Sequence, residues 1–555
     1  MYDRSFLRPD LIAGVTVTAL VVPKNLGYAE IAGVPIENGL YAAAAGAILY
    51  AIFGTSRQIS TGPSSGLAAV AGSTVLAASL GTDADAAALV AAIALVAGII
   101  FVAMSLLRMG WISQFISKAV ITGFLFGAAI DVIVGELSKI TGTEADGDNA
   151  WQELWSWFEG VGDLHGTTAL VGVLSLAVLF GLHAAAPSLP GELIVVAVGL
   201  LVSTALDLKA RGVALVGDVP RGLPSIEVPD LHVVADHFGL VALAATAIVM
   251  IGFSQSAGDA RFFAAKNGYQ VNIDRESLAQ GAANIGAGLF QGIPVSTSLS
   301  ASSLNDRAGA KSPIASLVTG GTIVLTLIFL APLFSQLPKA VLGAVVIEAV
   351  TLGMMDVPEL RRLFAVKRSD FYIAIAALSG VVLFGVLAGV LIGVLLSLIW
   401  LLRVTTSPSI PLLGRASGTH VFRDLDDFPG DEQVPGVLAI RLEGALFFAT
   451  ADSLEERIHQ LIDKSEEQLE LVILDCQSVN FIDAQGAEKI SRIYRYLAAR
   501  NIAFHLSRVK KSALEVLERD GVVAEIGPEK FHLDVSDAVD AYLTRCRSGE
   551  RTGVR

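Results

Sequence analysis

Charged side chains are scarce in this chain of 555 residues: Asp, Glu, Lys and Arg together make up 17% of it. An average soluble protein contains about 25% of them. Hydrophobic residues make up 53% of the chain, and the mean hydropathy is +0.63. Water-soluble domains could not bury so much apolar surface, so the composition excludes them for most of the chain and predicts an integral membrane protein.

Other absences narrow the range of possible functions. The chain has only two cysteines, Cys476 and Cys546, which argues against a disulfide framework and suits a reducing compartment. A net charge of −14 leaves no basic excess for a nucleic-acid partner. The eight histidines lack metal-ligand spacing, no Gly-x-Ser-x-Gly strip occurs, and the turn at Gly62-Pro63-Ser64 has no P-loop lysine. We therefore expect no enzyme, no metal site and no cofactor.

The charges that do occur are unevenly spread. They occupy 12% of residues 1–410 but 30% of residues 411–555. This shift predicts a membrane domain over 1–410, followed by a linker and one soluble domain within 411–555. The first apolar stretch, from Leu11, continues directly into further spans, so we expect an anchor rather than a cleavable signal peptide.

Apolar stretches of spanning length predict the membrane topology. The clear ones are 85–107, 167–183, 190–207, 238–256, 313–332, 338–355 and 370–402. The last is interrupted at Gly385 and Gly389 and is expected to form two spans. Weaker spans are expected at 11–29, 38–53, 111–134 and 277–292. Two short polar segments, 64–80 and the one after Gly292, are expected to be half-helices, which brings the count to about fourteen.

The basic residues predict the orientation. An even number of segments puts both termini on one side of the membrane. Fourteen Lys and Arg residues then fall in loops on that side and five on the opposite side. This positive-inside bias predicts that both termini and the C-terminal domain are cytoplasmic, in a multi-pass protein of the cytoplasmic membrane.

The two short segments stand in corresponding positions of the two halves. One begins Gly62-Pro63-Ser64-Ser65-Gly66, and the other runs from Gly292 to Ser300. Paired interrupted segments indicate an inverted-repeat transporter with its site at the midplane, although Gly and Pro are also common in ordinary membrane helices. A half-helix that starts inside the bilayer carries unpaired N–H groups and about +0.5 charge at its start. Two such ends, with Ser64, Ser65, Ser298 and Ser300 as further donors, predict a site for an oxygen-rich anion.

Four ionisable residues in or next to the predicted spans are candidates for a role. Lys24 follows Pro23 at a depth where a cation costs about 2.5–3.5 kcal/mol, so we expect it to partner either the substrate or a nearby acid. Lys118 and Asp131 are expected to serve structural pairing. Asp259, at the end of the span from 238, is expected to be either a proton or sodium site or an acid capped by Arg261.

Several blocks of the chain resemble the SulP family of anion transporters, whose animal relatives include prestin. The blocks are Pro23 to Ala29, Ile31 to Pro35, Gly39 to Tyr41, Gly54 to Arg57, Lys266 to Tyr269, Gln280 to Asn284 and Gly309 to Lys311. The C-terminal part is similar to the STAS domain that closes most members. A strand is expected at Leu471 to Asp475 and another at Ile502 to Leu506, with the loop Asp483 to Gly486 before an amphipathic helix.

The resemblance implies an α-helical polytopic membrane protein. Its fourteen segments would form a seven-plus-seven inverted repeat, with core and gate domains and two half-helices, followed by a small cytoplasmic α/β STAS domain. A homodimer and alternating access are implied as well. The substrate would lie against the first, third, eighth and tenth segments. The residues there are Lys24, Tyr28, Ser64, Ser65, Gly66, Gln255, Ser298, Leu299 and Ser300.

The chain departs from the family pattern at four places. Gln255 stands where relatives commonly carry an acid tied to cation coupling, and Ala301 where many carry Arg or Lys. Because Lys24 stands where Gln is common, we hypothesise that it supplies the missing positive charge. Asp259 is then the nearby acid available for coupling to sodium or protons. In the C-terminal part that is similar to a STAS domain, Ala484 and Gln485 have no hydroxyl group that could accept phosphate, so we expect no phosphorylation switch.

These observations predict secondary active or facilitated transport of an inorganic oxyanion, with sulfate as the first candidate. Bicarbonate and C4-dicarboxylates remain alternatives, because a site built on helix dipoles selects charge and oxygen geometry loosely. A different class of function also remains open, namely an anion-gated membrane sensor that signals through the STAS domain. Saturable uptake into vesicles separates a transporter from a sensor.

Overall fold

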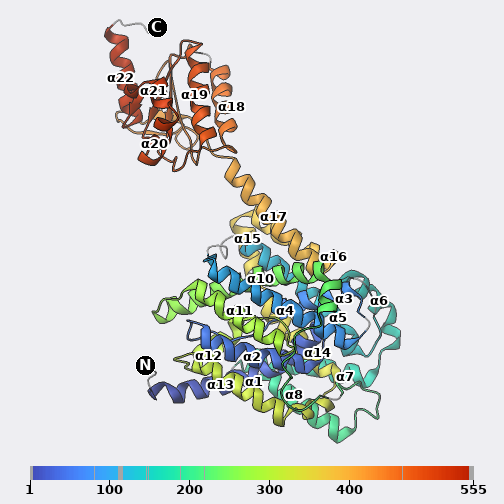
Figure 1. The fold of residues 1–555 in the computed structure, drawn as a ribbon. Helices are drawn as coiled ribbons and strands as arrows, with labels where there is room; N and C mark the ends of the chain where they lie inside the picture. The colour runs from blue at the N-terminus through green and yellow to red at the C-terminus, as the bar shows by residue number, and fades with distance from the viewer. Residues whose placement is uncertain are drawn as a thin grey trace. The chain divides into compact units, whose positions relative to one another are not determined.

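The computed structural model in Figure 1 describes residues 4–548 except 81, 111–116, 146, 148, 188 and 218. The chain divides into two compact units, residues 1–397 and 398–555. Each is described by itself below.

Fourteen helices correspond to the fourteen expected segments. They are α1 (Leu7–Ile31), α2 (Ile36–Phe53), α3 (Ser65–Ala78), α4 (Asp83–Leu106), α5 (Lys118–Thr141), α7 (Gly166–Ala185), α8 (Gly191–Leu206), α10 (Phe238–Asn267), α11 (Ile273–Leu289), α12 (Leu299–Arg307), α13 (Ile314–Phe329), α14 (Lys339–Met354), α16 (Arg368–Phe384) and α17 (Val386–Thr406). Three further helices were not expected from the apolar pattern: α6 (Ala150–Gly160), α9 (Leu231–Asp236) and α15 (Val357–Val366). In the described part of the chain, seven helical stretches are long and apolar enough to cross a membrane.

These helices pack into two bundles. One contains α1 to α4 and α10 to α13, held by contacts such as those of α11 with α4 and of α1 with α13. The other contains α5, α7, α8, α14 and α16, with α5 packing against both α14 and α16. The two bundles correspond to the core and gate domains that the resemblance implied. We use "core bundle" and "gate bundle" for them below.

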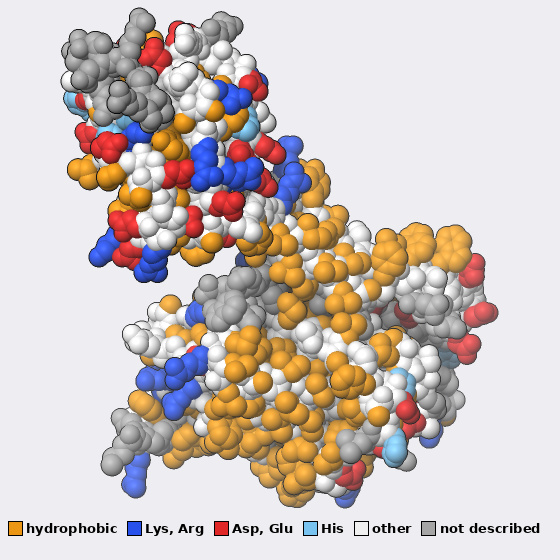
Figure 2. Space-filling view, turned by 45° about the horizontal axis from the view of Figure 1, so that its top comes forward, with side chains coloured by type: hydrophobic (Ala, Val, Ile, Leu, Met, Phe, Trp, Pro, Cys, Tyr) orange, Lys and Arg blue, Asp and Glu red, His pale blue; other side chains and the backbone are white. Residues whose placement is uncertain are grey.

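The outer surface of this unit is apolar. Figure 2 shows a broad hydrophobic face on it, and many large apolar side chains are exposed, among them Leu170, Val173 and Leu174 on α7 and Leu325 and Phe329 on α13. Soluble proteins rarely expose continuous apolar areas of this kind. The exposed face therefore suits contact with lipid.

The start of each half-helix is preceded by a short strand, and the two strands pair. Strand β1 (Thr61–Pro63) runs antiparallel to β2 (Val295–Thr297), with Gly62 opposite Ser296. The side chain of Asn284 on α11 accepts a hydrogen bond from the Val295 N–H (3.0 Å) and donates one to the Val295 carbonyl (2.8 Å). Irregular backbone inside a membrane unit needs such internal partners, because lipid offers none. The crossing places the starts of α3 and α12 side by side.

One sequence expectation, about α10, needs correction, whereas the structural pairing expected of Lys118 on α5 is found. Helix α10 does not end near residue 256 but continues to Asn267, because Ala260, Phe263 and Ala264 are buried and extend its packed face. Asp259 therefore lies within the helix rather than at its end. On α5, Lys118 pairs across to another helix: its Nζ lies 3.1 Å from Glu359 Oε1 on α15. Residues 111–116 of the span expected at 111–134 lie outside the described residues.

The long apolar run 370–402 divides as expected, but only one of its two glycines makes the break. Gly385 has a φ of +86° and separates α16 from α17. Gly389 lies inside α17, where a Cβ atom would overlap the Val381 side chain on α16. The first glycine is therefore needed for its backbone conformation, and the second for close helix packing.

We expect Gly39→Ala to destabilise the core bundle. A Cβ atom at Gly39 on α2 would overlap the carbonyl oxygen of Asn25 on α1, so the helices would have to move apart. Overpacking of this kind costs about 1–3 kcal/mol. The measurement is the thermal stability of the detergent-solubilised protein. Gly321→Ala on α13, where no atom lies within 4 Å of the new Cβ, is the matched control; equal melting temperatures for the two variants would contradict the prediction.

The second unit is an α/β domain, and both expected strands are confirmed. Its sheet has four parallel strands in the order β5 (Val437–Arg441), β6 (Leu471–Asp475), β7 (Ala503–Ser507) and β8 (Phe531–His532). A separate antiparallel pair joins β3 (Leu413–Arg415) and β4 (Phe422–Asp424). The helices are α18 (Ala451–Lys464), α19 (Ala484–Ala498), α20 (Lys511–Arg519), α21 (Val522–Ile526) and α22 (Val535–Ser548).

Local chemistry explains two features of this domain. Asp483 caps α19, since its Oδ1 accepts a hydrogen bond from the Gly486 N–H at 2.8 Å. Cys476 is buried, and burial raises the pKa of its thiol, so the nucleophilic thiolate is disfavoured. The side chain of Cys546 lies outside the described residues.

Candidate anion-binding site

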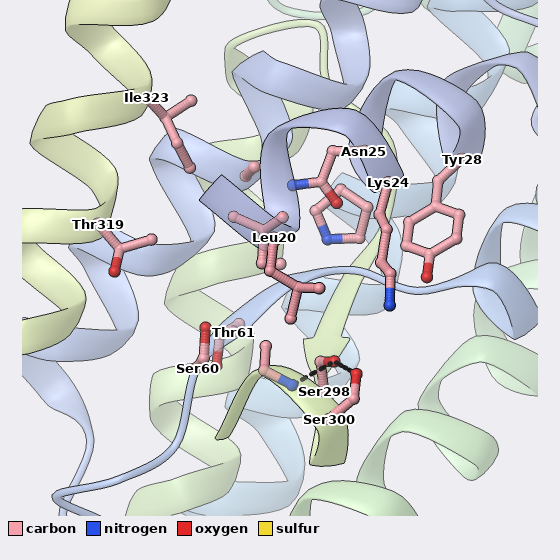
Figure 3. Close-up of a pocket in the computed structure, with 15 residues that line it drawn as sticks. Leu20, Lys24, Asn25, Tyr28, Ser60, Thr61, Ser298, Ser300, Thr319 and Ile323 are labelled. Carbon is pink, nitrogen blue, oxygen red and sulfur yellow. Dashed lines mark hydrogen bonds between the residues drawn. The ribbon is translucent and has the colours of Figure 1, made fainter. Parts of the chain in front are cut away.

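A pocket lies where the β1–β2 crossing faces α1 and α13 (Figure 3). All of its walls belong to the core bundle. Helix α1 contributes five of the lining residues, and the two half-helix segments contribute most of the rest. The lining residues are Leu20, Val21, Lys24, Asn25, Tyr28, Ala43, Ser60, Thr61, Gly62, Pro63, Ser298, Ser300, Ala301, Thr319 and Ile323.

The starts of both half-helices are rich in donors. Ser64, the residue before α3, is extended and makes no side-chain capping bond to the helix; its hydroxyl instead accepts a hydrogen bond from the Ser296 hydroxyl (3.3 Å). Ser298, the residue before α12, accepts a hydrogen bond from the Ala301 N–H at 3.4 Å, and its hydroxyl lies 3.2 Å from that of Ser300. Figure 3 shows the Ser298 and Ser300 hydroxyls below the Lys24 amino group. Positive helix ends, hydroxyls and an ammonium group thus surround one space.

Lys24 both lines the pocket and forms an ion pair. Its Nζ points into the pocket in Figure 3 and lies 3.1 Å from Glu192 Oε1 on α8. The two side chains are 16% and 9% exposed. Both roles considered for Lys24 from the sequence, as a partner for substrate or for an acid, therefore fit its position. The ammonium group has three donors, so the ion pair leaves others for an anion.

Two acids near Lys24 were missed from the sequence. Glu192 on α8 contacts it directly, and the carboxyl group of Glu348 on α14 interacts with that of Glu192. Asp259 is therefore not the only acid close to the site among the described residues, and its role in coupling stays a prediction. A usable signal existed, because Glu348 is the single acid of the apolar run 338–355, and Glu192 stands near the start of the run 190–207, whose other acid is Asp207 at its end. Both acids belong to the gate bundle, whereas Lys24 belongs to the core bundle.

The structure brings only part of the predicted site into the pocket lining. Lys24, Tyr28, Ser298 and Ser300 line it. The other members of the predicted site are not among the lining residues: Ser64, Ser65, Gly66, Gln255 and Leu299.

Four of these five residues have the following surroundings. Ser65 is buried, and its side chain interacts with the Tyr28 hydroxyl. A Cβ atom at Gly66 would come within 2.9 Å of Leu125 on α5, so this glycine faces the gate bundle. Leu299 is 52% exposed, and Gln255 is partly buried on α10. The lining residues Asn25, Ser60, Thr61 and Thr319 were not predicted.

Asp259 is held at the start of α12. Its Oδ2 accepts a hydrogen bond from Thr297 Oγ1 at 2.9 Å. Among the described residues no ion pair joins Asp259 to Arg261, so the capping alternative is not the arrangement found. Asp259 therefore lies next to the half-helix crossing but outside the pocket lining.

Comparisons with known proteins agree with this geometry. A model of the sulfate permease family matches residues 7–377, and a STAS domain model matches residues 429–538. The chain is 34% identical to a probable sulfate transporter of Mycobacterium tuberculosis (strain CDC 1551 / Oshkosh), over 98% of this chain and 97% of that protein. It is 30% identical to the chloroplastic sulfate transporter 4.1 of Arabidopsis thaliana, over 98% and 81% of the two chains.

Solved structures have the same fold. Murine solute carrier 26 family member A9 in its inward-facing state matches with a TM-score of 0.89 at 20% identity, over 98% of this chain and 92% of that one. The transmembrane domain of the cyanobacterium bicarbonate transporter BicA matches with a TM-score of 0.62 at 20% identity, over 72% and 98%. The family and the relatives are transporters, not enzymes. This chain therefore belongs to the sulfate permease family of multi-pass membrane anion transporters and carries the family's C-terminal STAS domain.

Proposed function

We propose that this protein transports sulfate across the cytoplasmic membrane by alternating access. The observation that carries the proposal is the β1–β2 crossing, which brings the starts of α3 and α12 to the pocket that Lys24 enters. The names of the relatives from Mycobacterium tuberculosis and Arabidopsis thaliana support sulfate as the substrate.

The donor set favours an anion with several acceptor oxygens. Lys24 supplies a positive charge, Tyr28, Ser298 and Ser300 supply hydroxyls, and the helix starts supply N–H groups. A tetrahedral dianion can accept hydrogen bonds from the ammonium group, the hydroxyls and the N–H groups at the same time. Bicarbonate has fewer oxygens and one charge, and a C4-dicarboxylate spreads its two charges over a longer molecule, so each would use fewer of these donors at the same time.

The remaining parts of the proposal follow from the sequence and the family. Both termini and the STAS domain lie in the cytoplasm, the membrane domain spans 1–410, and the STAS domain with its linker spans 411–555. The protein works as a homodimer. The substrate contacts the residues predicted above, with Lys24 as the positive charge that Ala301 cannot supply.

Uptake of labelled sulfate into proteoliposomes tests the proposal. We expect saturable uptake, with bicarbonate and fumarate as weaker competitors. If bicarbonate or fumarate is taken up saturably and sulfate is not, the proposed anion site stands and sulfate is not the substrate. Sulfate binding without uptake of any of the three anions would overturn transport and favour the sensor.

A further inference from the structure

The ionised groups around Lys24 do not balance. Lys24 carries one positive charge, and two carboxyl groups lie next to it, Glu192 in direct contact and Glu348 in contact with Glu192. The side chains of these two acids are only 9% and 6% exposed. With both acids ionised, this buried cluster would carry a net negative charge beside a pocket suited to anions.

The contact between the two acids is the decisive feature. Two ionised carboxylates repel each other, and neither has a hydrogen to donate, so a direct contact is favourable only when one of them holds a proton. In addition, Glu348 Oε2 is buried and has no hydrogen-bond partner among the described residues. A proton on the pair turns the contact into a hydrogen bond and leaves the charge of Glu192 balanced by Lys24.

Other titratable groups around Glu348 do not supply the missing positive charge through a close contact. From α7, His183 Nδ1 lies 4.0 Å from Glu348 Oε1, beyond hydrogen-bonding distance. From α1, Lys24 and Tyr28 face it across the core–gate boundary. From α8 there is Glu192, and α3 has no titratable residue. Helix α5 carries Asp131, for which the described residues show no ion pair, and Glu136 and Lys139, which belong to a separate cluster with Glu30.

We propose that Glu192 and Glu348 form a proton-binding site whose proton is taken up together with the anion. This inference rests on the proposed anion transport and adds the ion that accompanies the substrate. On loading, one proton from water adds to a carboxylate oxygen of the pair; on release it returns to water. With the proton bound, the Lys24 ammonium faces one carboxylate instead of two, so its positive charge acts on the anion in the pocket.

The position of the pair also links the proton to movement. Lys24 lies on the core bundle, and both acids lie on the gate bundle. Any sliding of one bundle along the other changes the distance between the ammonium and the two acids. Proton binding and the change of access are therefore coupled through the same three side chains.

A second cluster of similar composition makes a useful comparison. Lys139 Nζ contacts both Glu30 (3.0 Å) and Glu136 (2.8 Å), so each carboxylate there has the ammonium as a direct partner. In the Lys24 cluster, by contrast, no ion pair among the described residues joins Glu348 to the Lys24 ammonium. Glu136→Gln is consequently a matched control, since it neutralises an equally buried carboxyl that does not touch Lys24.

The test uses full-length protein in proteoliposomes. We expect the apparent Kd of the wild type for sulfate to rise by up to about tenfold for each unit of pH while the pair loses its proton. Glu348→Gln imitates the protonated acid, so sulfate counterflow at equal pH should persist, whereas the pH dependence of Kd and the uptake driven by a pH gradient should disappear. Glu136→Gln should behave like the wild type, and Glu192→Gln serves as the second variant if Glu348→Gln does not fold.

Several outcomes would overturn the inference. A pH-independent Kd in the wild type would do so, as would a pH dependence that survives both Glu348→Gln and Glu192→Gln. Loss of pH-gradient drive in Asp259→Asn or Glu136→Gln, but not in Glu348→Gln, would place the proton elsewhere.

Infrared spectroscopy separates this inference from the proposed function. A shared proton gives a carboxylic C=O stretching band in the wild type that titrates with pH and is altered in Glu348→Gln. If counterflow of sulfate were absent, the proposed function would fail, and the band would still decide the proton site. An unchanged band in the variant, or no such band in the wild type, would overturn it.

Discussion

Replacing Lys24 by glutamine should raise the apparent Kd for sulfate by about 10- to 150-fold. The reason is the loss of the cation among the groups that line the pocket. A hydrogen bond to a charged group contributes about 1.5–3 kcal/mol, and each 1.4 kcal/mol corresponds to about a tenfold change in affinity. The measurement is the concentration dependence of sulfate uptake into proteoliposomes, at protein amounts matched by quantification of the reconstituted transporter.

The ion pair with Glu192 requires a control for folding. Lys24→Gln leaves the buried carboxylate of Glu192 without its cation, which by itself destabilises the protein. The double variant Lys24→Gln/Glu192→Gln removes both charges and should regain thermal stability without regaining sulfate affinity. A double variant that binds sulfate as the wild type does would show that Lys24 is a partner of Glu192 and not of the anion.

The second large effect is expected in the STAS domain, at Asp475. This residue at the end of β6 is fully buried, and its carboxylate accepts hydrogen bonds from Arg441 Nε (2.7 Å) and Arg508 Nε (2.9 Å). Removing one partner of a buried ion pair costs about 3–5 kcal/mol. Because the two arginines are 17% and 25% exposed, water offsets part of this cost, so we expect Asp475→Ala to lose about 3 kcal/mol of unfolding free energy.

Proteolysis of the C-terminal unit in the full-length protein measures this loss. The fraction cleaved at a given denaturant concentration should increase for Asp475→Ala, while the membrane unit keeps its melting behaviour. Asp463→Ala, at an exposed position on α18, is the matched control and should change stability by less than about 0.5 kcal/mol. If Asp475→Ala and Asp463→Ala were equally protected from proteolysis, Arg441 and Arg508 would have found other partners, and the prediction would be wrong.

The membrane segments illustrate what local sequence patterns determine. Fourteen segments were expected, and fourteen helices correspond to them. For the seven stretches long and apolar enough to cross a membrane among the described residues, the reason is that the transfer of about 20 apolar residues into a bilayer is favourable whatever their neighbours are. The two half-helices were also located, since Pro63 and Pro294 interrupt the chain just before polar, small residues. The STAS strands followed from short buried runs bounded by turn residues.

The end of α10 and the partner of Lys118 could not be derived in this way. Beyond residue 256 the charged residues Asp259, Arg261 and Lys266 lower the local hydropathy, yet the helix continues because its other face packs on neighbouring elements. Lys118 pairs with Glu359 on α15, a helix whose place beside α5 is decided by packing. Hydropathy along the chain contains no information about where α10 ends or about which residue pairs with Lys118.

The candidate site, too, was predicted from the sequence only in part. Residue chemistry and family resemblance identified Lys24, Tyr28, Ser298 and Ser300, all of which line the pocket. Only the tertiary structure decided that β1 pairs with β2 and that Lys24 meets Glu192 and Glu348. The physical reason is that insertion into a membrane depends on the free energy of each segment separately. The partner of a buried charge depends on which helix faces meet, and that is settled by the packing of all the segments together.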